Sequence, residues 1–109
     1  MSDLRFVYIT APSAEVARDI GRIVVAERLA ACANVIDGLA SLYWWEGKVA
    51  EDREAALILK TRADRLPALT ARVKALHPYT VPCVVALPID EGQGNPDFLA
   101  WIRAEATGA

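Results

Sequence analysis

The spacing of apolar residues along the chain predicts alternating strands and helices. Residues 4–10 (LRFVYIT) are rich in β-branched and aromatic side chains and predict a strand. From residue 14 to about residue 29, apolar side chains recur at helical spacing, and Ser13 precedes them as a favourable N-cap. The pattern therefore predicts a first strand and a first helix, separated by a break at residues 11–13.

The middle of the chain predicts a long antiparallel hairpin. Its first strand begins near Cys32, turns or bulges at residues 37–38, and continues as extended structure to Trp45. Residues 46–48 form a tight turn, in which Gly47 is free to adopt positive φ. The return strand is expected from about residue 49 to residue 61.

Asp64 is expected to cap a second helix, with Pro67 in its first turn. This helix should end at residues 77–79 (HPY), because the residue before a proline resists helical geometry. Residues 84–89 (VVALPI) predict a further strand.

A short helix is expected near the C-terminus, with Asn95 as N-cap, Pro96 at the first helical position, and Phe98, Trp101 and Ile102 on its apolar face. The predicted order is β-α-β-β-α-β plus this last helix. That order is the split βαβ motif of ferredoxin-like α+β folds, in which two helices cover one face of an antiparallel sheet. We expect residues 1–109 to form a single domain of this kind.

The return strand is apolar on both faces. Side chains alternate along a strand, so Leu57 and Leu59 point to one face while Ala56 and Ile58 point to the other. The opposing strand carries three consecutive aromatic residues, which must also occupy both faces. Each buried aromatic hides roughly 150–250 Å². At about 25 cal/mol per Å², leaving two of them in water forfeits on the order of several kcal/mol.

An uncovered apolar sheet face of this size is typical of an interaction surface. The sequence therefore predicts a homo-oligomer with interface residues in the two hairpin strands, namely Tyr43, Trp44, Trp45, Leu57, Ile58 and Leu59. The alternative is that the C-terminal helix folds back and covers the second face of the sheet.

Composition narrows the functional classes. The chain has 109 residues, 54% of them hydrophobic, a net charge of −2 and a pI near 5.3, which argues against a nucleic-acid partner. No apolar run is long enough to span a membrane. The first residues, Met-Ser-Asp-Leu-Arg, lack the basic and apolar regions of a signal peptide, so a cytoplasmic location is expected.

Several segments resemble the CutA family of divalent-cation tolerance proteins, in the same order and spacing across nearly the whole chain. They are ERLAACAN (27–34), SLYWWEGK (41–48), LILKT (57–61), HPYTVP (77–82), ALPI (86–89), and the ending around Gly94-Asn95, Leu99, Trp101 and Ile102. The resemblance implies a ferredoxin-like subunit in a tight homotrimer related to PII signalling proteins, with hairpin strands pairing between subunits. It also implies tolerance of divalent metals, copper especially.

Three residues are candidate metal ligands, and no cofactor is obligatory. Cys32 matches the cysteine of the family's AAC motif and could bind Cu(I) as a thiolate, or be a small buried apolar residue. His77 matches the HPY motif and could bind Cu(II), or interact with the end of the preceding helix. Cys83 stands where the family pattern usually has Glu; it could favour softer metals or simply pack.

Lys60, Tyr79 and Trp101 match positions that the family places near an inter-subunit cleft. Lys60 is a cation in an apolar strand, so it could hold an anionic ligand there, or extend to solvent at the sheet end. The leading hypothesis is a trimeric, copper-binding metal-response protein without assured catalysis. The alternatives are a PII-like sensor of a small anion, and a thiol enzyme that uses Cys32 with His77 as base.

Overall fold

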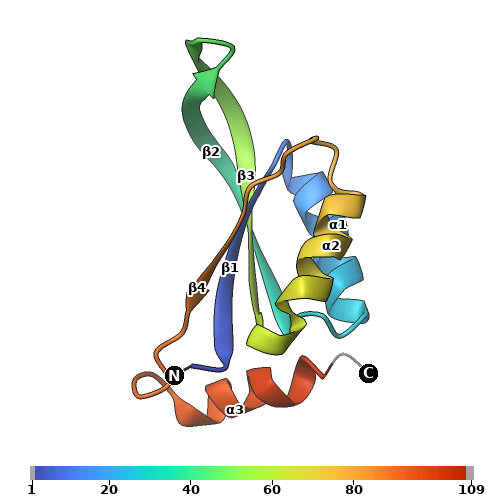
Figure 1. Cartoon of the computed structure of the whole chain (residues 1–109), viewed down its shortest axis with the longest axis vertical. Helices are drawn as coiled ribbons and strands as arrows, with labels where there is room; N and C mark the ends of the chain where they lie inside the picture. Colours follow the sequence, from blue (N-terminus) through green and yellow to red (C-terminus); the bar gives the residue numbers. More distant parts are fainter. Residues whose placement is uncertain (1, 108–109) are drawn as a thin grey trace.

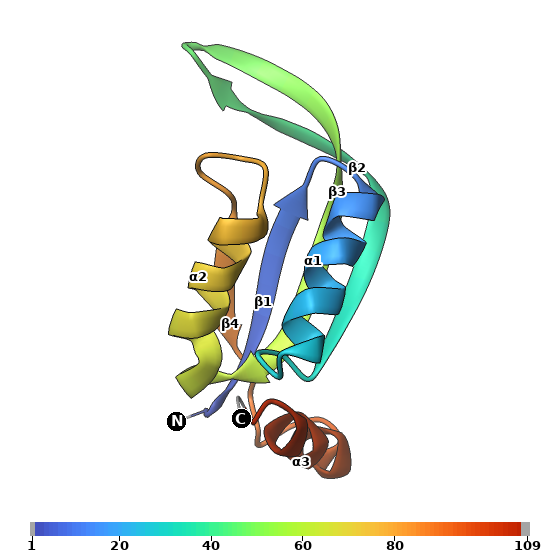
Figure 2. The same ribbon diagram turned by 90° about the vertical axis from the view of Figure 1, so that its right-hand side faces the viewer.

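A four-stranded antiparallel sheet forms the centre of the molecule, in a computed structural model that describes residues 2–107. The strands are β1 (Leu4–Ala11), β2 (Cys32–Trp45), β3 (Lys48–Arg62) and β4 (Val84–Pro88), in the order β2-β3-β1-β4. Helices α1 (Ala14–Ala26) and α2 (Leu66–Leu76) lie side by side on one face of the sheet (Figure 2). Helix α3 (Pro96–Glu105) crosses one end of the sheet (Figure 1). The predicted ferredoxin-like α+β fold is confirmed.

The predicted starts of α1 and α3 are confirmed by their N-cap hydrogen bonds. The Val16 N–H donates to Ser13 Oγ at 3.2 Å, and the Asp97 N–H donates to Asn95 Oδ1 at 3.0 Å. Both side chains satisfy backbone donors that a helix start leaves without a partner. Pro96 follows Asn95 as the first residue of α3, as predicted.

Two other helix predictions are wrong in detail. Helix α1 ends at Ala26 and not at Leu29, because Arg28 takes a φ of 63° and turns the chain toward β2. Asp64 does not cap α2: it lies in a short 3₁₀ turn (Ala63–Arg65), where its carboxylate accepts hydrogen bonds from Arg62 at 2.6 and 3.0 Å. The neighbouring guanidinium outcompetes the cap because an ion pair is within reach two residues away.

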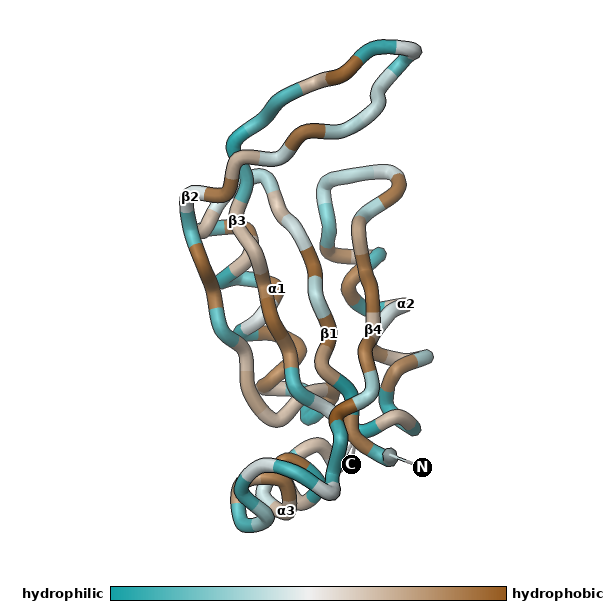
Figure 3. Tube along the Cα trace, turned by 90° about the vertical axis from the view of Figure 1, so that its left-hand side faces the viewer, coloured by the Kyte–Doolittle hydropathy of each residue, from teal (hydrophilic) through white to brown (hydrophobic). Residues whose placement is uncertain are grey.

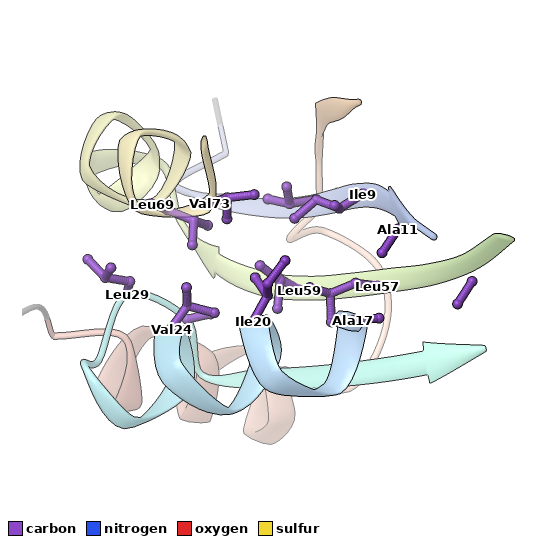
Figure 4. Close-up of a cluster of buried hydrophobic side chains, with 13 residues drawn as sticks. Ile9, Ala11, Ala17, Ile20, Val24, Leu29, Leu57, Leu59, Leu69 and Val73 are labelled. Carbon is purple, nitrogen blue, oxygen red and sulfur yellow. The ribbon is translucent and has the colours of Figure 1, made fainter. Parts of the chain in front are cut away.

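The main hydrophobic core lies between the sheet and the two helices (Figure 4). Alternate residues of the central strands point into it, and α1 and α2 close it with residues at helical spacing. All of the following are buried: Val7, Ile9, Leu57, Leu59, Ala17, Ile20, Val24, Leu69 and Val73. The predicted interface role is therefore wrong for Leu57 and Leu59, which are fully buried within their own chain.

Helix α3 packs at the end of the sheet and leaves its second face open (Figure 3). Its Ile102, together with Ala106, forms a small separate cluster with Leu4 and Ala31. The helix thus does not fold back over the sheet, and the alternative explanation for the apolar second face is wrong. Phe98 and Trp101, predicted on the apolar face of α3, are about two-fifths exposed and stack on each other with ring centroids 5.5 Å apart.

Within residues 2–107, none of the helices is both long enough and apolar enough to cross a membrane.

The contrast between the two sides of the molecule is testable with a matched pair of leucines. Leu59→Ala should lower the free energy of unfolding by about 2–5 kcal/mol, because it leaves a cavity in the core. Leu42→Ala, at a side chain that is 66% exposed, should have a smaller effect that depends on protein concentration. Urea denaturation at several protein concentrations measures both. If both variants lost the same free energy of unfolding, the contrast between a core leucine and an exposed leucine would be contradicted.

Candidate functional site

Figure 3 views the sheet from the side opposite α1 and α2, with apolar residues along all four strands. Strand register places Val85, Tyr8, Ile58 and Asn34 side by side across this face, and Leu87, Phe6, Lys60 and Cys32 in the next row. Cross-strand partners share a face, so these two rows, with Ile36 above them, form one surface. We call these nine residues the sheet patch.

The sheet patch is mostly apolar, and in the part of the chain that the structure describes α1 and α2 lie on the other face of the sheet. Ile36, Val85 and Leu87 are each about half exposed, whereas Leu57 and Leu59 on the opposite face are fully buried. A monomer rarely leaves a contiguous apolar surface of this extent in water. An exposed apolar surface of this kind is typical of protein–protein contact surfaces.

The hairpin beyond the body of the sheet has the same character. Trp44 and Trp45 are 76% and 63% exposed, and Tyr43 is more exposed than a core aromatic would be. The predicted exposure of these three aromatic residues in a single chain is confirmed, while their role in an interface stays a prediction. Sequence alternation puts Tyr43 and Trp45 on one side of the hairpin and Trp44 on the other.

One corner of the sheet patch is polar. Cys32 and Lys60 are direct cross-strand partners, and Lys60 Nζ donates to Asn34 Oδ1 at 2.6 Å. Within residues 2–107, Lys60 makes no ion pair, and its ammonium group donates a hydrogen bond to the neutral amide of Asn34. This corner offers a soft ligand and a cation on an otherwise apolar surface.

His77 is buried, and both of its ring nitrogens have partners. The Tyr79 N–H donates to Nδ1 at 3.1 Å, and Nε2 lies 2.8 Å from the carbonyl oxygen of Thr10. Since Nδ1 accepts, Nε2 must carry the proton and donate to Thr10. No lone pair of the ring remains for a metal ion. In this fold His77 does not fit the role of a metal ligand.

The three candidate metal ligands are not brought together in one chain. Cys32 pairs with Lys60 of β3, and Lys60 in turn pairs with Phe6 of β1. His77 instead contacts Thr10, which lies four residues beyond Phe6 on β1. Four residues of strand span about 13 Å. Cys83 precedes β4 at the opposite edge of the sheet. Across the described part of the chain, no group of three or more His, Cys, Asp or Glu side chains could hold a metal ion.

The three candidate cleft residues are also separated within one chain. Tyr79 bonds to Glu54, which lies six residues from Lys60 on β3, a span of about 20 Å. Trp101 lies on α3, which packs at the other end of the sheet. A cleft that contains all three would need residues from more than one copy.

Glu54 was not singled out by sequence reasoning, yet it is the most buried carboxylate of the site. It is 8% exposed, and its Oε2 accepts a hydrogen bond from Tyr79 Oη at 2.9 Å. Burial raises the pKa of Tyr79 to about 12, with smaller contributions from the Glu54 hydrogen bond and from nearby negative charge. The one available signal was an acid directly before the apolar run Ala55–Leu59, but its partner is 25 residues away in sequence.

A second tyrosine–carboxylate pair lies further along the hairpin. The Tyr43 hydroxyl donates to Asp52, and this hydrogen bond is the main reason why the pKa of Tyr43 is raised. Both members of the pair lie in the hairpin itself, so this contact joins its two strands. The Tyr79–Glu54 contact differs, because it joins the hairpin to the loop between α2 and β4.

Comparison with known proteins gives consistent matches. The family model described as CutA1 divalent ion tolerance protein matches residues 5–105. The divalent-cation tolerance protein CutA of Thermus thermophilus is 57% identical over 102 residues, which cover 94% of this chain and 96% of that relative. A solved structure of a divalent cation tolerance protein from the same organism superposes with a TM-score of 0.89 at 53% sequence identity, covering 94% of this chain and 97% of that one.

One plant relative is matched by this chain over only part of its length. The chloroplastic protein CutA 1 of Oryza sativa is 48% identical over 97 residues, which cover 89% of this chain but 54% of the relative. The chain thus spans about half the length of that relative.

The tyrosine in contact with Glu54 gives a prediction about alkaline pH. Because the pKa of Tyr79 in the folded chain is about 12, above the ordinary value of 10.0, its contribution to stability is present below pH 10. That contribution should be lost as the pH rises from 10 to about 12. Tyrosinate absorbance should show a late-titrating group that is missing in Tyr79→Phe. A native titration identical to that of the variant would contradict the burial of this hydroxyl.

Proposed function

Because the chain belongs to the CutA1 family of divalent ion tolerance proteins, we propose that it works as a copper-binding homotrimer in metal tolerance. The family membership supports the role in metal tolerance. The homotrimer, copper as the ion, and a cytoplasmic location are the finer parts of this proposal.

The observation that carries the proposal is the uncovered sheet patch. It is apolar, it is continuous across four strands, and α3 does not cover it. Identical copies that face one another would bury it, and would also enclose the exposed aromatic residues of the hairpin. Assembly thereby brings together residues that one chain keeps apart.

Cys32 is the residue that we assign to copper. It lies in the sheet patch, half-buried and free of any disulfide, so copies that share this surface carry their thiols into one enclosure. Thiolates select Cu(I) over harder ions, and a site of this kind does not need three ligands from one chain. Cys83 precedes β4, outside the sheet patch, and we assign it to packing.

A second candidate function rests on Lys60. Its ammonium group contacts only a neutral amide oxygen within the described residues, so a small anion would supply the missing charge. In an assembled protein this would make a PII-like sensor site. Thermal stabilisation by phosphorylated metabolites that survives a chelator but is lost in Lys60→Gln would favour this function over metal binding.

The thiol-enzyme hypothesis is not favoured by the geometry. A cysteine nucleophile needs its base within hydrogen-bond reach. In one chain, the strand register separates Cys32 from His77 by about 13 Å along the sheet alone, and the His77 lone pair is already used by Tyr79.

Copper binding is testable with two variants that each replace one cysteine by serine. Cys32→Ser should lose stoichiometric Cu(I) binding, because serine is a much poorer ligand for a soft ion, whereas Cys83→Ser should keep it. Anaerobic Cu(I) titration against a competing chelator, with native mass spectrometry, measures both. If the unchanged protein binds no Cu(I) or Cu(II) at stoichiometric level, the copper part of the proposal fails.

The assembly is testable by placing a charge in the sheet patch. Val85→Asp should convert the oligomer to monomers, because a carboxylate beside Tyr8 would be buried against the other copy without a positively charged partner. Ala68→Asp, on the exposed surface of α2, is the control and should stay assembled. Sedimentation velocity distinguishes the two. A native protein that sediments as a folded monomer at micromolar concentration would refute the trimer.

A further inference from the structure

The long hairpin leaves the body of the molecule at one identifiable point. Strand β1 pairs with β3 as far as the partners Ala11 and Ala55, so every residue of β3 before Ala55 has β2 as its only neighbour strand. A register shift in β2 between Ile36 and Leu39 lies at the same level, opposite Glu54. Figure 2 shows the hairpin bending here, over the loop that joins α2 to β4. Glu54 is therefore the first hairpin residue beyond the sheet.

A two-stranded ribbon can twist and bend relative to the sheet from which it extends. Isolated hairpins are marginally stable and twist more than wider sheets, and a bulge increases the local bend. Within residues 2–107, the ladder between β2 and β3 is the only sheet pairing that this segment has. Within one chain, its angle to the body therefore depends on the bulge and on the side chains at the bend.

A chain of hydrogen bonds spans this bend. His77 Nε2 donates to the carbonyl oxygen of Thr10 at the end of β1, and His77 Nδ1 accepts from the Tyr79 N–H. The two rings also pack, with centroids 4.7 Å apart. Tyr79 Oη then donates to Glu54 Oε2 at 2.9 Å. The contacts thus run from the body, through the loop, to the first residue of the hairpin.

We propose that the His77–Tyr79–Glu54 chain is a brace that fixes the angle of the hairpin, and so positions its aromatic residues for docking on another copy. Each link is a directional contact, and the last one ends on the carboxylate of Glu54, a residue that is 8% exposed. Losing the Tyr79 hydroxyl would leave that carboxylate without this donor, which makes the bent position of the hairpin less favourable. His77 is thus a positioning residue, and its place in the HPY motif does not depend on metal.

The test is amide hydrogen exchange on the full chain with Tyr79→Phe, which deletes one hydroxyl. Amides of residues 39–54 should exchange about tenfold faster, as expected for a lost charge-assisted hydrogen bond, while those of β1 and α1 stay unchanged. The fraction of oligomer in sedimentation should fall in parallel. Arg72→Gln removes an exposed ion pair with Glu27 on the helix layer and is the matched control, expected to change neither readout.

Two histidine variants separate the links of the brace. His77→Asn keeps an acceptor near the Nδ1 position and should preserve most protection of the hairpin, whereas His77→Gln keeps only the donor toward Thr10 and should resemble Tyr79→Phe. Nitrogen chemical shifts of the native ring should show protonated Nε2 and unprotonated Nδ1. Equal exchange in the hairpin of native protein and Tyr79→Phe, or a protonated Nδ1, would overturn the brace.

This inference rests on the proposed assembly for its role in docking, and the experiment keeps the two apart. A native protein that is monomeric would refute the assembly, while faster exchange confined to residues 39–54 in Tyr79→Phe would still establish the brace. Stoichiometric copper binding that is lost in both histidine variants while the hairpin remains protected would overturn the positioning role and make His77 a ligand.

Discussion

The alternation of apolar side chains along β3 is the constraint from which the rest of the structure follows. Leu57 and Leu59 fill the core beneath α1 and α2, and Ile58 between them must face the other way. Two helices are enough to cover one face of a four-stranded sheet, and α3 is engaged at the end of the sheet with Leu4 and Ala31. Among residues 2–107 the second face therefore has no cover, although it is built largely from the same apolar residue types as the core.

This constraint also determines where metal chemistry can take place. The residues with suitable donor atoms are distributed over both edges and both ends of the sheet, and the single histidine uses its lone pair to accept from Tyr79. Cys32 remains, on the surface that other copies would cover. In the proposed assembly, binding of a soft metal ion and self-association would be linked, because the surface that encloses the thiol would form only when copies associate.

Local patterns in the sequence were sufficient for the fold but not for the site. Strand alternation, helical spacing and the caps at Ser13 and Asn95 each depend on neighbours within a few residues, and they predicted the order of the strands and α-helices but not the 3₁₀ turn before α2. The cap at Asp64 failed because Arg62 competes for the same carboxylate. The contacts of His77 and Glu54 join residues 67 and 25 positions apart, and no periodic pattern reports such a pairing.

The difference between local patterns and long-range contacts also explains why the HPY motif at residues 77–79 has one interpretation in the sequence and another in the folded chain. As a sequence motif, a histidine beside a tyrosine suggests a ligand or a base, since these are the common functions of imidazole. In the folded chain, Pro78 ends α2 and directs Tyr79 back across the ring of His77, so the tyrosine N–H occupies the nitrogen that a metal would need. The motif is then a structural element at the bend between body and hairpin. In the proposed assembly, contact with another copy depends on the direction of that hairpin, and this would give the motif a role in function without any chemistry of its own.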